Sequence, residues 1–333
     1  MKVFIIAEVG NLHNGSLDLS KELARSAAEC GADAVKFQTH IFSAESLADA
    51  PNPAYFQAES RKAYFERTAF TVAQWQELKK FVEAECRLEF MSSPFSEAAV
   101  DLLEQVGMRR YKIPSGEVTN ILLLQKIART KKAVLLSSGM SSWEELDAAV
   151  NVFRKAACDL TVMQCSSIYP CPPEKVGLNN LVEMKQRYNL PVGLSDHTFG
   201  FAASIAAVVL GASVIEKHLM LSSGMYGSDV KHSLVPAEFR RFVKEIREAE
   251  AVLSAETSKD ALAQELHSMK VIFQKSIVAA RVIPKGTVIQ RDMLDFKKPG
   301  DGIGAERFFE VVGKRAKTDI PMNTKIKEEM LEA

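Results

Sequence analysis

The chain has 333 residues, of which 47% are hydrophobic and 25% are charged, a balance typical of folded globular proteins. Its 42 basic and 42 acidic side chains cancel, which argues against a nucleic-acid partner because such proteins need a basic face. The five cysteines are scattered and form no CxxC pair, so neither a disulfide framework nor a cysteine-based zinc site is expected. No signal peptide is evident, and Gly211 divides the longest uncharged run (199–215). We therefore expect a cytoplasmic protein with no membrane partner.

Residues 1–253 repeat one pattern, in which apolar runs of strand length alternate with helical segments. Thr71 with Gln74, and Ser142 with Glu145, have the spacing of capping boxes at helix starts. Repeated alternation predicts a parallel sheet, and eight repeats favour a closed (β/α)₈ TIM barrel over an open doubly wound sheet. The eight runs are residues 3–8, 32–38, 88–93, 109–115, 133–138, 160–167, 192–197 and 213–218.

A long segment follows the second run. Residues 44–67 hold the aromatic residues Tyr55, Phe56, Tyr64 and Phe65. Long ordered insertions in this position often form lids or subunit contacts, and the aromatic side chains favour order over disorder.

The pattern changes after residue 253. Residues 254–271 are polar and rich in small residues, which predicts a linker. Beyond it, residues 276–283 and 287–290 resemble short strands, so residues 272–333 are expected to form a small second domain. A domain of this size is marginally stable alone, and we expect it to pack on the barrel or on a second subunit.

Polar or ionisable residues end nearly every apolar run of the barrel. The carboxyl ends of the strands form the active-site face of a TIM barrel, so these residues predict a catalytic rim. Glu8 and Glu117 are candidates for holding substrate hydroxyls or moving protons. The other residues at the run ends are Lys36, Gln38, Ser92, Ser93, Lys112, Ser115, Ser137, Ser138, Ser166, Ser167, Ser195, His197, Glu216 and His218.

His197 and His218 end the seventh and eighth runs, which are neighbours in a barrel. Two imidazoles at adjacent strand ends predict a shared divalent metal, either manganese or magnesium, although imidazole alone also suits zinc or iron. Asp196 and Glu216 lie close to these histidines in the sequence. We assign both carboxylates to the opposite strand face, as supporting residues.

Lys36 and Lys112 form a second group, for which the residue types leave two interpretations open. With Ser93, Ser115 and Ser195 they would make a cradle for a small phosphorylated or carboxylated substrate. Alternatively, one of the lysines forms the Schiff base of a metal-independent aldolase.

Motifs along the whole chain match one family in order. They are IAEVGNLHNGS (6–16), GADAVKFQTH (31–40), MSSPFS (91–96), YKIPSGE (111–117), IYP (168–170), GLSDHTFG (193–200), VIEKHLML (214–221), RVIPKG (281–286) and KPGDGIG (298–304). The sequence therefore resembles the sialic acid (nonulosonate) synthase family, which includes legionaminate, pseudaminate and spore-coat polysaccharide synthases. The last two motifs resemble the family's antifreeze-like (SAF) domain.

The resemblance implies a role for each matching residue. His197 and His218 match the metal ligands, usually of manganese or magnesium, and Glu8 and Glu117 match catalytic positions. The phosphoenolpyruvate contacts correspond to Lys36, Ser93, Lys112, Ser115, Ser167 and Ser195. The contacts around the sugar correspond to Gln38, Tyr169, Asp229 and Lys298. These roles disfavour the Schiff-base interpretation.

The resemblance also implies a reaction and an assembly. Family members condense phosphoenolpyruvate with an amino sugar such as N-acetylmannosamine, and phosphate leaves by cleavage of the carbon–oxygen bond. They form domain-swapped homodimers in which the SAF domain covers the partner's barrel. The alternatives are a synthase of the 3-deoxy-octulosonate 8-phosphate type and a non-catalytic sugar-binding paralogue.

Three positions differ from the common family pattern. Ser167 replaces an asparagine common in N-acetylneuraminate synthases, Val230 replaces a usual histidine, and Lys298 replaces a common arginine. Lysine keeps the positive charge but loses the planar two-pronged donor of arginine. The identity of the amino sugar therefore stays open.

Overall fold

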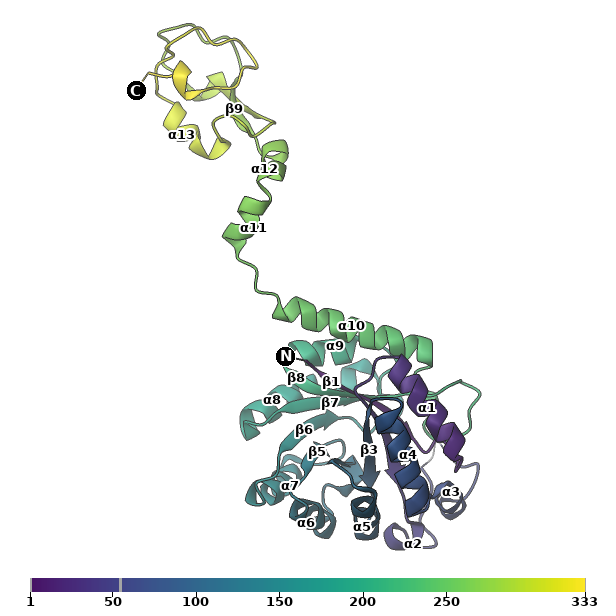
Figure 1. Cartoon of the computed structure of the whole chain (residues 1–333). Coiled ribbons are helices and arrows are strands. Elements are labelled where there is room, and N and C mark those ends of the chain that lie inside the picture. The colour runs from purple at the N-terminus through teal and green to yellow at the C-terminus, as the bar shows by residue number, and fades with distance from the viewer. Residues whose placement is uncertain (1, 54–55, 333) are drawn as a thin grey trace. The chain divides into compact units, whose positions relative to one another are not determined.

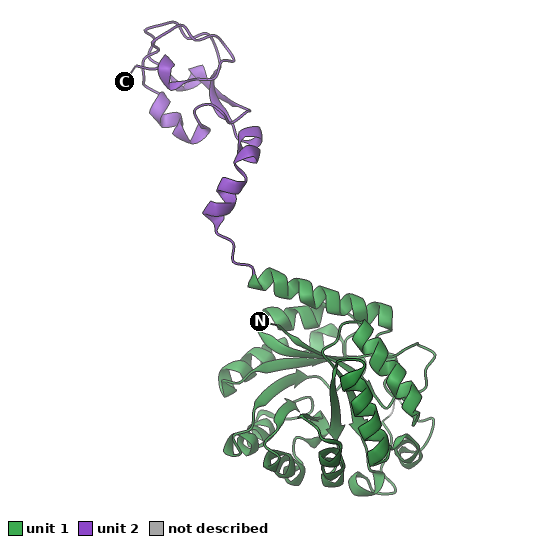
Figure 2. Ribbon diagram, viewed as in Figure 1, with its two compact units in different colours: residues 1–254 green, residues 255–333 purple. Residues whose placement is uncertain are grey.

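The computed structural model describes residues 2–53 and 56–332, so Tyr55 lies outside the described residues. The chain divides into two compact units, Met1–Ser254 and Ala255–Ala333 (Figure 2). None of the helices in these described ranges combines the length and the apolar character needed to cross a bilayer.

The first unit is built on eight strands in the order β3-β2-β1-β8-β7-β6-β5-β4, and every hydrogen-bonded pair is parallel. β3 and β4, at the two ends of this order, lie close together, so the sheet nearly closes into a barrel. Each predicted run overlaps one strand, and the predicted (β/α)₈ architecture is confirmed. The strands are β1 (Phe4–Gly10), β2 (Ala34–Thr39), β3 (Glu89–Pro94), β4 (Arg110–Ile113), β5 (Ala133–Ser137), β6 (Leu160–Cys165), β7 (Val192–Asp196) and β8 (Ala212–His218).

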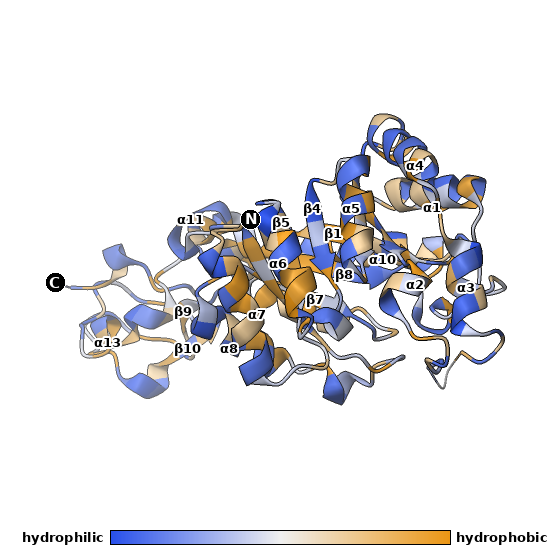
Figure 3. Ribbon diagram, turned by 90° about the horizontal axis from the view of Figure 1, so that it is seen from below, coloured by the Kyte–Doolittle hydropathy of each residue, from blue (hydrophilic) through white to orange (hydrophobic). Residues whose placement is uncertain are grey.

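Helices surround the barrel (Figure 1). Both predicted capping boxes are present, at the starts of α4 and α7. In Figure 3 the helices carry hydrophobic and hydrophilic segments, as expected where one face packs on a sheet. The helices are α1 (Leu17–Glu29), α2 (Phe42–Glu45), α3 (Arg61–Thr68), α4 (Val72–Ala84), α5 (Glu97–Val106), α6 (Ile121–Arg129), α7 (Trp143–Lys155), α8 (Leu178–Tyr188), α9 (Ala202–Val209) and α10 (Pro236–Ser254).

Side chains alternate across the barrel wall, because successive residues of a strand point to opposite faces. The outward-facing residues pack against the helices and form the larger core. The inward-facing apolar residues form a smaller cluster that fills the lower barrel: Ile6, Ala34, Met91, Leu135, Met163 and Val214. Two residues further along these six strands, the inward residue is polar or charged in five strands and is Cys165 in β6.

The second unit has a separate hydrophobic core, which includes Ile277, Ile283, Ile303 and Ile320. Its two-stranded antiparallel sheet pairs the first predicted run with a strand that was not predicted. Residues 287–290 make an isolated bridge through Val288 instead of a ladder. The unit contains α11 (Lys259–Glu265), α12 (His267–Phe273), β9 (Ser276–Ala279), β10 (Leu294–Lys297) and α13 (Phe308–Val311).

Candidate active site

A cavity of about 510 Å³ lies at the carboxyl ends of the barrel strands. Glu117 is not among its lining residues and accepts a hydrogen bond from Asn120, while Lys298 belongs to the second unit. The cavity brings together the other predicted site residues: Glu8, Lys36, Gln38, Ser93, Lys112, Ser115, Ser167, Tyr169, Ser195, His197, His218 and Asp229.

Two lysines and two glutamates meet at the base of this cavity. Lys36 Nζ lies 2.7 Å from Glu8 Oε2 and 3.6 Å from Glu216 Oε2. Lys112 Nζ donates to Glu216 Oε1 at 2.7 Å, and the Ser195 hydroxyl donates to the same oxygen at 2.9 Å. All four charged side chains are buried. Their charges therefore balance one another in a space where water cannot screen them.

The two carboxylates in this group differ in protonation. Burial raises the pKa of Glu8 to about 7, although the nearby Lys36 ammonium opposes this shift. Burial acts on Glu216 in the same direction, but Lys112 and Lys36 outweigh it and lower its pKa to about 2. Glu216 is thus the permanent counter-ion of the lysines, and Glu8 is the carboxylate that can take up a proton near neutrality.

The prediction that Glu216 points away from the site is wrong. Glu216 and His218 are two residues apart on β8, so both side chains face the cavity. Asp196, one residue before His197, does lie on the other face of the wall. There it forms a buried ion pair with Lys217, with a distance of 2.9 Å between Oδ2 and Nζ.

A chain of hydrogen bonds reaches Glu8 from the edge of the barrel. The Gln38 amide nitrogen donates to Glu8 Oε1 at 2.8 Å. The Gln38 amide oxygen accepts from His40 Nε2 at 3.1 Å, and His40 Nδ1 lies 2.8 Å from Glu45 Oε1. These hydrogen bonds orient the Gln38 amide. The amide in turn holds Glu8 Oε1, the carboxylate oxygen that is not paired with Lys36.

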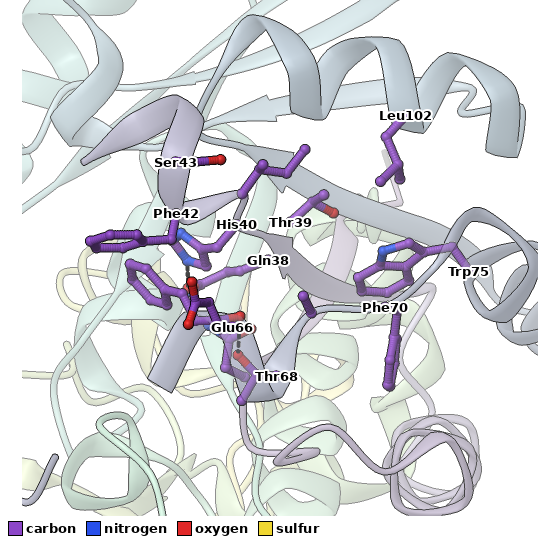
Figure 4. A pocket seen from close by; sticks show the side chains of 14 residues that line it. Gln38, Thr39, His40, Phe42, Ser43, Glu66, Thr68, Phe70, Trp75 and Leu102 are labelled. Atoms are coloured by element: carbon purple, nitrogen blue, oxygen red, sulfur yellow. Dashed lines mark hydrogen bonds between the residues drawn. The ribbon is translucent and has the colours of Figure 1, made fainter. Parts of the chain in front are cut away.

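His40 and Gln38 also separate the main cavity from a smaller one of about 220 Å³. Figure 4 shows these two residues on one side of the smaller cavity and Trp75 on the other. The His40 ring stacks between Phe65 and Phe95, with ring centroids 3.8 and 4.0 Å away. Packing thus holds His40 in position, which makes it a positioning residue that sequence reasoning missed.

Part of the predicted insertion covers the main cavity. Phe56, Tyr64 and Phe65 all line it, and the rings of Phe56 and Tyr64 lie 4.9 Å apart. In the described part of this segment, these three aromatic side chains therefore pack at the cavity.

Two serine contacts extend the polar wall near the lysines. The Ser115 and Ser167 hydroxyls lie 2.8 Å apart, and Lys36 Nζ donates to Ser93 Oγ at 3.2 Å. Hydroxyls and ammonium groups that converge in this way can bind the oxygens of a phosphate or a carboxylate.

The histidines form a second group in the cavity. The rings of His197 and His218 lie 5.4 Å apart, and His197 Nδ1 donates to the backbone carbonyl of Ser166 at 3.0 Å. This bond leaves His197 Nε2 as the nitrogen with a free lone pair. Burial lowers the pKa of His197 to about 4 and also lowers the pKa of His218, so both rings are neutral. Neutral imidazoles in a buried cavity fit a divalent metal.

Sequence reasoning missed a third histidine beside this pair. The ring of His232 lies 4.5 Å from that of His218 and 4.7 Å from that of Tyr169. His232 follows β8 in an irregular loop, where no strand periodicity marks its direction. Its only sequence signal was the unusual segment 224–234 around Val230.

Replacing Glu216 by glutamine should remove a negative charge that offsets the charges of Lys36 and Lys112. We expect Glu216→Gln to lower the free energy of unfolding by about 3 kcal/mol, because the buried Lys112 ammonium loses its charged partner. Added inorganic phosphate should then raise the melting temperature of the variant more than that of the wild type, since the anion replaces the lost charge.

Thermal unfolding with and without phosphate measures both effects. Glu183→Gln is the matched control, because its exposed pair with Arg187 contributes little. Equal phosphate-induced shifts in wild type and Glu216→Gln would contradict an anion site at the lysines.

Known proteins resemble this chain over nearly its whole length. Residues 23–258 match the NeuB family, and residues 274–332 match the SAF domain. The N,N'-diacetyllegionaminic acid synthase of Campylobacter jejuni is 37% identical over 98% of this chain and 99% of its own length. The pseudaminic acid synthase of Campylobacter jejuni is 34% identical over 98% of this chain and 96% of its own length.

A solved structure covers both units. The putative spore coat polysaccharide biosynthesis protein E of Chromobacterium violaceum is 27% identical and has a TM-score of 0.72. The match covers 100% of this chain and 100% of that chain. The chain therefore belongs to the NeuB family and carries a SAF domain after its barrel.

Proposed function

We propose that this protein is a transferase that condenses phosphoenolpyruvate with an N-acetylmannosamine-like amino sugar. The products are a nonulosonic acid and phosphate, released by carbon–oxygen cleavage. The single observation that carries the proposal is the buried pair of Lys36 and Lys112 at the base of a cavity that also contains neutral imidazoles. Phosphoenolpyruvate has two anionic groups, and each needs charged or hydroxyl partners once it leaves water.

The lysines and serines bind and orient phosphoenolpyruvate. The Lys36 and Lys112 ammonium groups exchange part of their contact with the glutamates for contact with the substrate anions. The hydroxyls of Ser93, Ser115 and Ser167 then donate to the remaining oxygens. Holding both ends of the molecule presents its methylene carbon in a fixed direction, which lowers the entropic cost of the reaction.

Glu8 is suited to proton transfer in this reaction. Its pKa of about 7 means that it both takes up and releases a proton near neutral pH. Gln38 holds one of its oxygens, so the carboxyl group keeps a fixed orientation toward the reacting atoms. Glu117, whose pKa burial raises, is the second predicted proton carrier.

The proposed ion is Mn²⁺ or Mg²⁺, held by His197 and His218. When bound, the ion supplies Lewis-acid polarisation of the sugar's aldehyde oxygen. The bond from His197 Nδ1 to Ser166 keeps the other ring nitrogen directed away from that carbonyl. Burial keeps both rings deprotonated, as metal ligation requires.

The relatives support a nonulosonic acid as the product, since they are named for legionaminic and pseudaminic acids. We propose Gln38, Tyr169 and Asp229 as sugar contacts within the barrel cavity. Lys298, in the second unit, is the proposed contact with the sugar's acyl group.

We also propose a cytoplasmic, domain-swapped homodimer, in which Lys298 reaches the partner's site. The helices α11 and α12, with Leu266 between them, expose the apolar residues Leu262, Leu266, Met269 and Phe273. An apolar surface of this kind is suited to a subunit contact. Light scattering should give a solution mass of twice the chain mass, and a mass of one chain would contradict the dimer.

The direct test is phosphate release from phosphoenolpyruvate with Mn²⁺ and a panel of amino sugars. The panel contains N-acetylmannosamine, its 6-phosphate, and the two 6-deoxy-diacetamido sugars that lead to legionaminic and pseudaminic acids. We expect release with one sugar, and loss of release with a chelator or in His218→Ala. Lys112→Met should lower kcat/KM by about 100-fold, because a charged contact to the substrate is lost.

Lys126→Met serves as a control, since Lys126 pairs with Asp101 on the surface. Release that survives both the chelator and His218→Ala would overturn the metal requirement and reopen the Schiff-base interpretation. No release with any sugar, from a folded dimeric protein, would count against this acceptor class.

A further inference from the structure

We infer that His218, Asp229 and His232 form a divalent-metal site of two imidazoles and one carboxylate, selective for first-row transition ions over Mg²⁺. The inference rests on the proposed function in one respect, since it adds ligands to the ion that is proposed to bind at His197 and His218. It adds Asp229 and His232, which were not predicted as ligands, to the predicted ligand His218.

The three side chains converge on one point. One ligand atom from each of them lies within 4.8 Å of the other two. His232 Nε2 is 3.7 Å from Asp229 Oδ1, and His218 Nδ1 is 3.9 Å from Asp229 Oδ2. These separations are too long for hydrogen bonds. They suit two atoms bound to one ion, because two bonds of about 2.1 Å span up to about 4.2 Å.

The nitrogens at this point have no other partner among the described residues. His218 Nδ1 and both ring nitrogens of His232 are buried without a hydrogen bond. The exposed fraction is 6% for His218 and 2% for His232. Buried polar atoms are almost always satisfied, so unpartnered nitrogens that face a carboxylate are suited to bind a cation.

The loop after β8 fixes the positions of Asp229 and His232. Asp229 precedes the one-turn 3₁₀ helix η3 (Val230–His232), in which side chains three residues apart lie on the same side. Asp229 and His232 have this spacing. The Ser228 hydroxyl donates to Asp229 Oδ1 at 2.9 Å, and the Ser233 hydroxyl donates to the Asp229 carbonyl at 2.7 Å.

Gly10, at the end of β1, completes the support from the opposite side. A Cβ atom at this position would lie 2.3 Å from Asp229 Oδ2, and the backbone has φ +52°. Only glycine therefore lets the carboxylate approach the strand this closely. The carboxylate is held by the backbone on one side and by its own loop on the other.

The donor atoms determine which ion is preferred. Two imidazoles and a carboxylate are a common ligand set for Fe²⁺ and related transition ions, and the set leaves open positions. Mg²⁺ prefers oxygen ligands and retains its water, so it gains little from two nitrogen donors. His197, the other ligand in the proposed function, has its ring 6.1 Å from that of His232 and lies beside these open positions.

The test measures metal binding alone, without either substrate. Metal-free protein is titrated with Co²⁺, whose visible absorption reports nitrogen ligation, and the titration is repeated in the presence of excess Mg²⁺. We expect one Co²⁺ per chain, little competition by Mg²⁺, and an affinity about 10- to 100-fold lower in His232→Phe. Phenylalanine keeps a ring against Tyr169 and His218 but offers no ligand.

Two glycine variants test the role of the Asp229 carboxylate without replacing any of the proposed ligands. Gly10→Ala should weaken Co²⁺ binding, because the new methyl group displaces Asp229. Gly107→Ala is its matched control, since Gly107 also has a positive φ, at +83°, but has no atom within 4 Å of an added Cβ. His267→Ala controls for adventitious binding to an exposed histidine.

The result that overturns the inference is unchanged Co²⁺ affinity in folded His232→Phe and Gly10→Ala, with the affinity lost only in His197→Ala and His218→Ala. Failure of the proposed function would give a different experimental result. In that case Co²⁺ binding depends on His232 as expected, but no amino sugar supports phosphate release. The two outcomes are read from separate experiments on the same proteins.

Discussion

The charge balance of four buried side chains is the constraint on which the site depends. Lys36 and Lys112 would be very costly to bury alone, and Glu8 and Glu216 offset their charge. These residues come from four strands that are far apart in the sequence, so only closure of the barrel brings them together. In the proposed function, an incoming anionic substrate replaces part of the carboxylate contact, so the same lysines pair with the glutamates before binding and with the substrate afterwards.

Along the barrel strands, the inward residues that pack in the core come before the inward residues that line the cavity. Inward residues such as Met91 and Leu135 fill the lower barrel, and the next inward residues, Ser93 and Ser137, line the cavity. Rigid strand ends thereby fix the lysines and serines, as the proposed reaction of two substrates would require. The loop after β8 adds Asp229, which an irregular backbone can bring over the mouth.

Much of the fold could be predicted because its signals are local. Apolar runs marked the strands, and the Ser142–Glu145 spacing marked a helix start that the structure confirms. The position of β10 was missed because this strand has only four residues and is only partly buried, so the alternation of its apolar and charged residues is too short to stand out. Glu216 was assigned to the wrong face although a spacing of two residues places it with His218. His232 could not be placed, since loop geometry and tertiary packing determine its direction.

Labelled phosphoenolpyruvate tests the proposed reaction most directly. The substrate carries ¹⁸O at the oxygen that bridges C2 and phosphorus, and the accepted amino sugar is added with Mn²⁺. We expect the released phosphate to contain the label, as found by mass spectrometry, because condensation followed by carbon–oxygen cleavage leaves that oxygen on phosphorus. Unlabelled phosphate, with ¹⁸O retained in the organic product, would mean cleavage of the phosphorus–oxygen bond and would contradict the proposed condensation.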